Sequence, residues 1–281
     1  MNRPQSVNLN NLQSSTIVLC TGAPQGCVLS PVLYSLFTND CVSHHASVQL
    51  IKFVDDTTVE GLIENSDKSA YRQEVGCLLS RCGRNNLELN TSKTKEMIID
   101  FRREKSRSAP LLINGSLIEI VGSFKFLGTT ISSGCDRKAN INSTLQKAQQ
   151  RMYFLRQPKK FGLLCEILLQ FYRAVIESVL CFSLSVWFSN TTKDQRRRLS
   201  RVVKNAGRII ECELPSLEEM YLKRSVARLN RIIADQSHSA HGLFQLLLSG
   251  KRYRALRART SRLSSSFFVQ ALDALNRNLA V

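Results

Sequence analysis

The spacing of apolar residues changes near Gly134, and this change restricts the fold of the 281-residue chain more than any other feature. Before Gly134, short apolar runs separated by turn-forming residues are typical of strands. Beyond it, five apolar residues recur at intervals of 4, 3, 4 and 3, as on one face of a helix: Ile141, Leu145, Ala148, Met152 and Leu155. The sequence therefore predicts an α+β protein in which a mixed part precedes an all-helical part.

We expect three regions. Residues 1–133 form the mixed part, with strands at 46–54, 57–63, 95–101 and 124–131, a helix at 67–86, and a hairpin at 111–121 turned at Asn114-Gly115. Residues 134–235 form the helical part and continue from the first amphipathic helix into helices at 163–188, 194–211 and 216–235. Residues 236–281 are basic and rich in serine, which predicts a loosely held, flexible tail.

Charge is distributed unevenly along the chain. The formal net charge of +17 and a pI near 9.8 favour a polyanionic partner, with nucleic acid ahead of an anionic membrane surface. Residues 1–100 carry 8 Lys and Arg against 10 Asp and Glu, whereas residues 101–281 carry 31 against 12. The sequence thus favours a protein that chelates cations in its first part and contacts phosphates with its second.

The cysteines and the apolar runs narrow the class of protein. Nine cysteines, an odd number with no CxxC pair, argue against a disulfide scaffold or a zinc site and favour the nucleus or cytoplasm. The N-terminal residues are polar, unlike a signal peptide. The most apolar stretch, 178–188, is too short to span a bilayer, so we expect a buried helix there and no membrane partner.

Asp55 and Asp56 follow the apolar run "IKFV" and precede a second strand-like run, "TTVEGLI". This order predicts a hairpin whose tight turn consists of the two aspartates. Two carboxylates at the tip of a hairpin can hold Mg²⁺ or Mn²⁺, and such ions orient phosphates for an in-line displacement. An Asp-Asp pair is also ordinary in turns, so these residues alone fit an acidic surface turn as well.

The loop "TGAPQGCVLSP", residues 21–31, contains two glycines and two prolines and precedes a predicted helix. Small residues let a backbone approach a base or a phosphate closely, and Gln25 offers both a donor and an acceptor. We expect Ser30 to cap the helix and Pro31 to occupy its first position. The simpler interpretation is an ordinary connection between a strand and a helix.

Lys93 and Lys95 lie just before the strand predicted at 95–101. A lysine near a metal-binding pair can neutralise or protonate a leaving pyrophosphate. A solvated basic turn explains the same residues without any chemistry.

Taken in order, four segments resemble the reverse transcriptase domain of non-LTR (LINE-type) retrotransposons. "TGAPQGCVLSPVLYSLFTND" is similar to the loop and helix that contact template and nucleotide, and "FVDD" to the aromatic-x-Asp-Asp motif, with Val54 where alanine is more usual. "LNTSKTKEMIIDF" is similar to the lysine-bearing motif, and "FKFLGTTIS" to the primer-grip hairpin. The resemblance covers residues 3–135 and extends more loosely to about 235, which implies a partial polymerase palm followed by a basic, thumb-like helical region.

The resemblance also implies a role for each matching position. Asp55 would be the metal ligand and Asp56 its neighbour, with Mg²⁺ or Mn²⁺ as the cofactor, and Lys93 would be the candidate general acid. The residues lining the nucleotide and template pocket would be Gly22, Ala23, Pro24, Gln25, Gly26 and Ser30. Those holding the primer end would be Phe126, Leu127 and Gly128. The implied partners are an RNA template and a DNA primer.

The sequence departs from the family pattern at one catalytic position. Polymerases of this kind need another aspartate on a strand upstream of the glycine-containing loop. Residues 1–20 contain no Asp or Glu, and the first acidic residue, Asp40, follows that loop. We therefore expect this chain alone to be an inactive retrotransposon remnant, with apolar surface exposed where the strand would pack.

A second hypothesis is a nucleic-acid-binding module without catalysis. In the helix predicted at 194–211, apolar residues occupy one face and six cations lie largely around the rest: Arg196, Arg197, Arg198, Arg201, Lys204 and Arg208. Such cations bind phosphates in a salt-sensitive manner that does not depend on base sequence. A solvated basic helix without a partner is the alternative.

A third hypothesis rests on a second resemblance. The segment 166–211 is similar to one at the N-terminal side of AlkB-like iron/2-oxoglutarate oxygenases that modify tRNA. An iron site of that kind needs two histidines and a carboxylate, usually beginning His-x-Asp/Glu. None of the four histidines begins such a motif: His44, His45, His238 and His241. We expect neither oxygenase nor tRNA methyltransferase activity from this segment.

Overall fold

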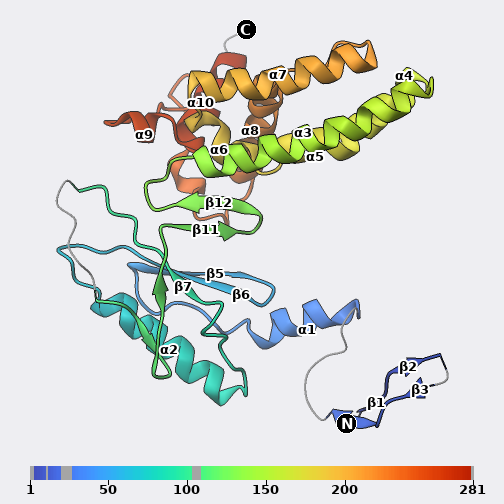
Figure 1. The fold of residues 1–281 in the computed structure, drawn as a ribbon. Helices are drawn as coiled ribbons and strands as arrows, with labels where there is room; N and C mark the ends of the chain where they lie inside the picture. Colours follow the sequence, from blue (N-terminus) through green and yellow to red (C-terminus); the bar gives the residue numbers. More distant parts are fainter. Residues whose placement is uncertain (1–2, 11, 20–26, 103–108, 280–281) are drawn as a thin grey trace. The chain divides into compact units, whose positions relative to one another are not determined.

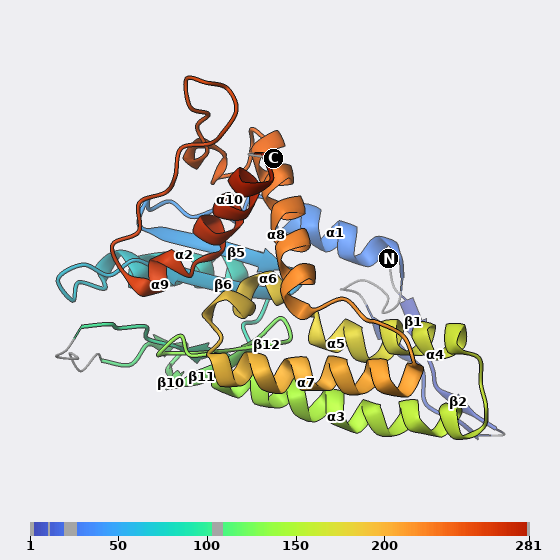
Figure 2. The same cartoon turned by 90° about the horizontal axis from the view of Figure 1, so that it is seen from above.

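A computed structural model describes residues 3–10, 12–19, 27–102 and 109–279 (Figures 1 and 2). The chain forms two compact units. The first unit comprises Met1–Glu96 and Ser106–Glu119, and the second comprises Met97–Lys105 and Ile120–Val281. The described elements are helices and small two-stranded sheets, which confirms the expected α+β class.

The strands of the first unit are short and pair as antiparallel hairpins. The pairs are β1 (Arg3–Gln5) with β4 (Ile17–Leu19), β2 (Asn8–Leu9) with β3 (Leu12–Gln13), β5 (Val48–Phe53) with β6 (Asp56–Gly61), and β8 (Leu112–Ile113) with β9 (Ser116–Leu117). The predicted turn at Asn114-Gly115 is confirmed, since both residues have positive φ, 48° and 76°, as a two-residue hairpin loop requires.

The core of the first unit is small. Helix α2 (Ser69–Arg84) packs on the β5–β6 hairpin and contributes Val75 to a cluster of buried residues. The other members of that cluster come from the β8–β9 region: Leu111, Ile113 and Ile118. A cluster of this size removes little apolar surface from water, so we expect this unit to be marginally stable by itself.

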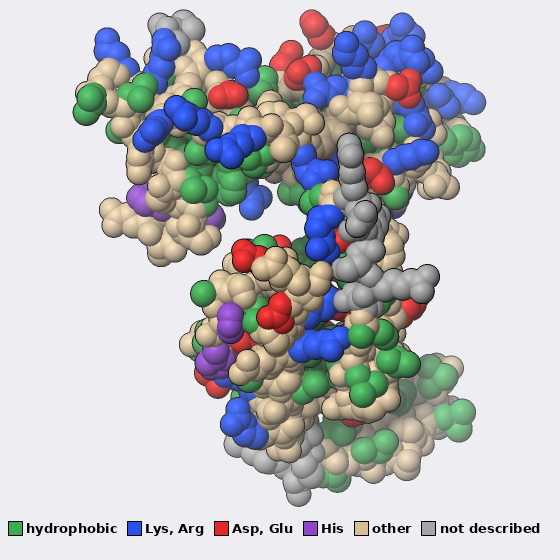
Figure 3. Space-filling view, turned by 90° about the vertical axis from the view of Figure 1, so that its left-hand side faces the viewer, with side chains coloured by type: hydrophobic (Ala, Val, Ile, Leu, Met, Phe, Trp, Pro, Cys, Tyr) green, Lys and Arg blue, Asp and Glu red, His purple; other side chains and the backbone are tan. Residues whose placement is uncertain are grey.

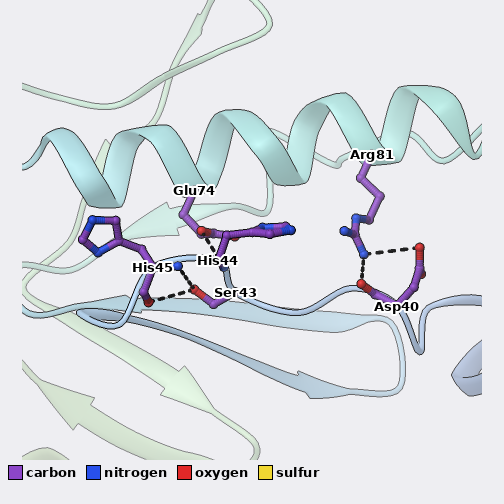
Figure 4. A network of polar contacts seen from close by, with 6 residues as sticks. All are labelled: Asp40, Ser43, His44, His45, Glu74 and Arg81. Carbon is purple, nitrogen blue, oxygen red and sulfur yellow. Dashed lines mark hydrogen bonds and ion pairs between the residues drawn. The ribbon is translucent and has the colours of Figure 1, made fainter.

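Polar contacts fix the loop before β5 to α2 (Figure 4). The buried carboxylate of Glu74 accepts a hydrogen bond from the backbone N–H of His44 at 3.1 Å, and its other oxygen lies 3.4 Å from Nδ1 of the same histidine. Two turns along α2, the Arg81 guanidinium lies 3.4 Å from a carboxylate oxygen of Asp40. These contacts hold both ends of the loop, and therefore the start of β5, against one helix.

Three local predictions for residues before Gly134 are wrong. Helix α1 (Leu29–Phe37) begins one residue before Ser30, with Val28 as its N-cap, so Ser30 is a helical residue rather than the cap. Pro31 is tolerated there because the first N–H groups of a helix lack intrahelical acceptors. The strand expected at 95–101 is limited to β7 (Lys95–Glu96). The single strand expected at 124–131 is wrong, whereas the hairpin that the resemblance implies for this segment is present.

The second unit consists of helices preceded by a hairpin. Its strands are β10 (Glu119–Ile120, which begins at the boundary), β11 (Ser123–Phe126) and β12 (Thr129–Ser132). Its helices are α3 (Lys138–Lys160), α4 (Cys165–Phe171), the π-helix η1 (Tyr172–Glu177), α5 (Ser178–Leu180), α6 (Leu184–Trp187), the 3₁₀-helix η2 (Phe188–Asn190), α7 (Lys193–Ile210), α8 (Leu217–Ala234), the 3₁₀-helix η3 (His241–Leu243), α9 (Ser261–Ser264) and α10 (Phe267–Asn278).

The main hydrophobic core lies among α3, the α4–α6 run and α7. The apolar face predicted for α3 is confirmed, because all five of its residues are buried. The predicted helices at 194–211 and 216–235 correspond to α7 and α8, and each begins with a capping box. The helix expected at 163–188 is interrupted instead by the π-helix η1 and by Ser183, whose φ is 48°.

The α4–α6 run is also strongly apolar. By length and composition alone, Cys165–Asn190 is long enough to cross a membrane, so the expected short stretch belongs to a longer one. The core helix of a soluble protein has the same properties, and Leu168, Tyr172 and Ile176 have no exposed surface. Buried residues of the α4–α6 run form part of the main hydrophobic core.

The structure contradicts the loose tail expected at 236–281. Helix α10 packs against α8, and the two lie side by side in Figure 2. Ala271 and Leu272 of α10 are completely buried in a second cluster that includes Leu229 of α8. The basic, serine-rich composition of the preceding residues concealed a helix whose apolar face orders this segment.

Candidate functional site

The acidic pair lies at the tip of the β5–β6 hairpin. Phe53 is paired with Asp56, so the two-residue turn consists of Val54 and Asp55, and Asp56 is the first residue of β6. The expected Asp-Asp turn is therefore displaced by one residue. Val54 has a φ of 55°, a conformation that is uncommon for a β-branched residue, and both aspartates are exposed.

A shallow hollow beside this tip lies between α1 and α2. Its lining includes Tyr34, Lys52, Val54 and Arg81. Burial, and next the charge of the Asp55 carboxylate, raise the pKa of Tyr34 above its usual value. Lys52 donates a hydrogen bond to the backbone carbonyl of Thr38, and Arg81 pairs with Asp40. Both cations therefore already have partners in the segment that follows α1.

The carboxylates present do not fit a two-metal polymerase site. Asp55 and Asp56 are adjacent and exposed, but within the described ranges no group of three or more His, Cys, Asp or Glu side chains converges to hold a metal ion. Mg²⁺ bound through only one or two protein carboxylates usually depends on waters and substrate phosphates for its remaining ligands. The hairpin can thus offer at most a partial ligand set.

Lys93 lies in an exposed turn organised by Asn90. The Asn90 side-chain oxygen accepts hydrogen bonds from the Lys93 N–H at 3.1 Å and from the Ser92 hydroxyl at 2.7 Å. Lys95, two residues further along the chain, pairs with Glu119 at 2.6 Å. The geometry fixes the backbone of Lys93 and leaves its side chain in solvent.

The residues expected to line the nucleotide and template pocket lie mostly outside the described part of the chain: Gly22, Ala23, Pro24, Gln25 and Gly26. Ser30, the last of that set, is described and belongs to the first turn of α1. The structure therefore gives a position for only one member of the set.

The three residues expected at the primer end form the turn of the β11–β12 hairpin. Phe126 ends β11, and Leu127 and Gly128 occupy the two turn positions with φ of 43° and 85°. A Cβ at Gly128 would lie 2.9 Å from the Phe182 ring, so the turn approaches that ring closely. On β12, Thr130 donates to the buried side chain of Asn140 at 3.1 Å, which joins the hairpin to α3.

Helix α7 has one buried face and one basic face. Its buried residues are Leu199, Val202, Val203, Ala206 and Ile210. On the opposite side, four exposed cations follow at intervals of 4, 3 and 4 and share one stripe: Arg197, Arg201, Lys204 and Arg208. We call these four residues the α7 stripe. Figure 3 shows how Lys and Arg side chains gather over the helical second unit.

The six cations predicted on this helix are not equivalent. Arg196 is half-buried, donates to Thr191 at 2.9 Å, pairs with Glu218 at 3.7 Å and lies over the Phe188 ring. Arg198 donates to Asn142 of α3. Arg196 and Arg198 therefore help to hold the helix in place.

Within the α7 stripe, Arg197 pairs with Asp194 at 2.9 Å, an exposed contact. Arg201, Lys204 and Arg208 make no ion pair or side-chain hydrogen bond to another residue in the described ranges. The stripe is the part of α7 that is open to a partner.

A second hollow, of about 230 Å³, lies in the C-terminal part of the second unit. Its lining consists of Leu243, Gln245, Arg254, Ala255, Leu256 and Arg257. These residues were expected in the loose tail, so sequence reasoning missed them. The missed signal is Ser266 followed by the apolar spacing of Val269, Leu272 and Leu275, which predicts a packed helix after the basic segment.

Comparisons with known proteins cover the β5–β6 hairpin. Residues 4–131 match the reverse transcriptase (RNA-dependent DNA polymerase) family. The chain is 25% identical over 198 residues to the RNA-directed DNA polymerase from mobile element jockey of Drosophila melanogaster, covering 64% of this chain and 21% of the relative. It is 26% identical over 159 residues to a probable RNA-directed DNA polymerase from transposon BS of the same species, covering 53% and 18%. The jockey polymerase of Drosophila funebris is 23% identical over 238 residues, covering 75% and 25%.

The motifs and these matches support a reverse transcriptase domain over residues 4–131. More particularly, the three relatives support a portion derived from the reverse transcriptase of a non-LTR retrotransposon. It spans no more than about a quarter of the length of the three relatives. No solved structure shows significant similarity to the chain.

A second family also matches part of the chain. Residues 137–178 match the N-terminal segment described as alkylated DNA repair protein alkB homolog 8. The resemblance expected at 166–211 is thus shifted toward the N-terminus and overlaps only at 166–178. The matched residues include all of α3, α4 and η1 and contain no His or Asp, so they carry none of the histidines of a two-histidine iron site.

Proposed function

We propose that this 281-residue chain is a reverse transcriptase portion that binds template and primer nucleic acid but does not polymerise nucleotides by itself. In this proposal the first unit is a partial palm and the second a thumb-like binding region. The nucleic acid is an RNA template paired with a DNA primer, and the parent polymerase uses Mg²⁺ or Mn²⁺.

The α7 stripe is the observation that carries the binding function. Its four cations share one exposed face because the opposite face is buried in the main core. A rigid helix presents these charges with little loss of backbone entropy, and phosphate contacts from Lys and Arg release counterions. Binding by this stripe depends on salt and not on base sequence.

Catalytic incompleteness rests on the ligand set at the β5–β6 tip. Asp55 would bind the metal and Asp56 would support it, while Lys93 would act as the general acid. Two metals about 3.5–4 Å apart need ligands that approach from more than one strand, and the described residues offer only this adjacent pair. The role proposed for Phe126, Leu127 and Gly128 is to hold the primer end at a rigid turn.

Primer extension tests the catalytic part of the proposal. The purified chain is incubated with a primed RNA template, dNTPs and Mg²⁺ or Mn²⁺, beside a complete reverse transcriptase as the positive control. We expect no extension above background. Extension that is lost in Asp55→Ala would show that the hairpin is a working site and would overturn the claim of incompleteness.

A salt titration tests the binding part. The affinity for a fluorescent RNA/DNA duplex is measured for the chain, for Arg201→Gln/Lys204→Gln, and for the control Lys223→Gln/Arg231→Gln. The control removes the same charge from exposed positions on α8. We expect the α7 variant alone to lower the slope of log K against log salt by roughly 1 per charge. Equal slopes for the two variants would exclude the α7 stripe as the interface.

A further inference from the structure

The C-terminal basic loop, residues 245–259, has an unusual charge. From Gln236 to Leu272 the chain contains no Asp or Glu, yet six cations fall within twelve residues: Lys251, Arg252, Arg254, Arg257, Arg259 and Arg262. Arginine dominates the set, and its planar fork binds phosphate oxygens in pairs. The local charge is therefore suited to a phosphate-bearing partner.

The loop is held in place although it contains little regular structure. Asn276 of α10 donates to the Tyr253 carbonyl at 3.0 Å and accepts from the Tyr253 N–H at 2.9 Å, so one side chain satisfies both backbone groups. The Arg254 N–H donates to the Gln245 carbonyl at 2.7 Å, and the Leu247 N–H to the Arg252 carbonyl at 2.8 Å. These contacts reduce the entropy that the loop would lose on binding.

Apolar packing anchors the same loop. Tyr253 and Leu256 pack against the second cluster, which α8 and α10 form. Because Leu256 points to this cluster, Arg254 and Arg257 remain exposed at the hollow described above. Leu243 and Leu256 give the hollow an apolar lining, and Gln245 adds an amide that can both donate and accept.

The cations at this hollow have no acidic partner. In the parts of the chain that the structure describes, no ion pair involves Arg254 or Arg257, and both are exposed. Arg262 differs, since its guanidinium lies 3.4 Å from the centre of the Phe101 ring. Arg262 of α9 is thus anchored to a ring, whereas Arg254 and Arg257 of the loop are open to a ligand.

We propose that the C-terminal basic loop is a second nucleic-acid site, which binds single-stranded RNA through Arg254 and Arg257 independently of the α7 stripe. The apolar lining of the hollow contacts a base or sugar, Gln245 hydrogen-bonds to the base, and the arginines bind the flanking phosphates. A hollow of about 230 Å³ can receive the base of an unpaired nucleotide but is too small for a duplex. This inference extends the proposed nucleic-acid function and does not require the α7 stripe to act.

Binding of a fluorescent single-stranded RNA by the full chain tests the proposal. The variant is Arg254→Gln/Arg257→Gln, and the matched control is Lys223→Gln/Arg231→Gln, with folding checked by circular dichroism. We expect the loop variant to bind about tenfold more weakly and to lose about 1.4 from the salt slope, 0.7 for each of two phosphates, while the control is unchanged. A loop variant that behaves like the control overturns the proposal.

Two further arms separate other outcomes. The variant Arg201→Gln/Lys204→Gln should retain most of its binding to single-stranded RNA. If this variant alone loses binding, the result supports the function proposed for the α7 stripe and contradicts the loop site. If the loop variant alone loses binding to both the RNA/DNA duplex and single-stranded RNA, the result would support the loop site and contradict the function proposed for the α7 stripe. Leu248, fully exposed in the loop, provides the lipid control: binding to phosphatidylserine vesicles that Leu248→Ser abolishes, without RNA binding, would overturn the proposal.

Discussion

Val54, the residue before Asp55, adopts a backbone conformation that its side chain disfavours. Its φ of 55° costs an L-residue about 1–2 kcal/mol, and glycine escapes that cost but loses about 0.5–1 kcal/mol in chain entropy. We therefore predict that Val54→Gly stabilises the β5–β6 hairpin by about 0.5–1 kcal/mol. Native-state hydrogen exchange of the hairpin amides measures this change. Thr57→Gly, within β6, should reduce protection instead, and reduced protection in both variants would show that Val54 is unstrained.

Gly128, in the β11–β12 turn, has both a positive φ of 85° and a neighbouring ring. We predict that Gly128→Ala destabilises the second unit by about 1–3 kcal/mol, because its Cβ meets Phe182 and its backbone becomes strained. Denaturant unfolding measures the loss, and Gly122→Ala, where a Cβ meets nothing within 4 Å, is the control. Adding Phe182→Ala should recover only the steric part. Full recovery in the double variant would exclude backbone strain.

Among the described helices of eight or more residues, α1 alone has no buried residue. Leu29, Leu33 and Leu36, at intervals of 4 and 3, are 62%, 55% and 68% exposed. We predict that Leu33→Lys/Leu36→Lys lowers the binding of an apolar fluorescent dye and raises soluble yield without changing stability by more than about 0.5 kcal/mol. Leu168→Lys, at a fully buried position, should unfold the second unit. Unchanged dye binding in the α1 variant would place the accessible apolar surface elsewhere.

The helices that the sequence predicted well are those whose apolar residues keep one spacing throughout. In α3 every predicted core position is buried, and in α7 the predicted apolar face packs in the core, because a 3.6-residue period determines a face without reference to other elements. Turns depend on pairing between strands, so the β5–β6 turn was displaced by one residue. Helix α10 was missed because its apolar face gains stability only against α8, a contact that local composition does not report.

At the scale of the whole molecule, the buried residues are divided unequally. Two clusters, with twenty and seven buried residues, belong to the second unit, whereas four form the cluster of the first. Because hydrophobic stabilisation grows with the area buried, the second unit should be more stable by itself than the first.

We therefore predict that residues 120–281 fold as a separate polypeptide, unfold cooperatively on heating, and bind RNA as the full chain does. In the full chain, amides of α2 and β5–β6 should exchange through openings of lower free energy than those of α3 and α7, because fewer buried contacts oppose them. Hydrogen exchange resolved by peptide measures both sets in one sample. The Leu33→Lys/Leu36→Lys variant is the control, since it alters the first unit without changing the core of the second. Equal protection of the two sets, with a single coincident transition, would show that the chain unfolds as one unit and that the small cluster owes its stability to the rest.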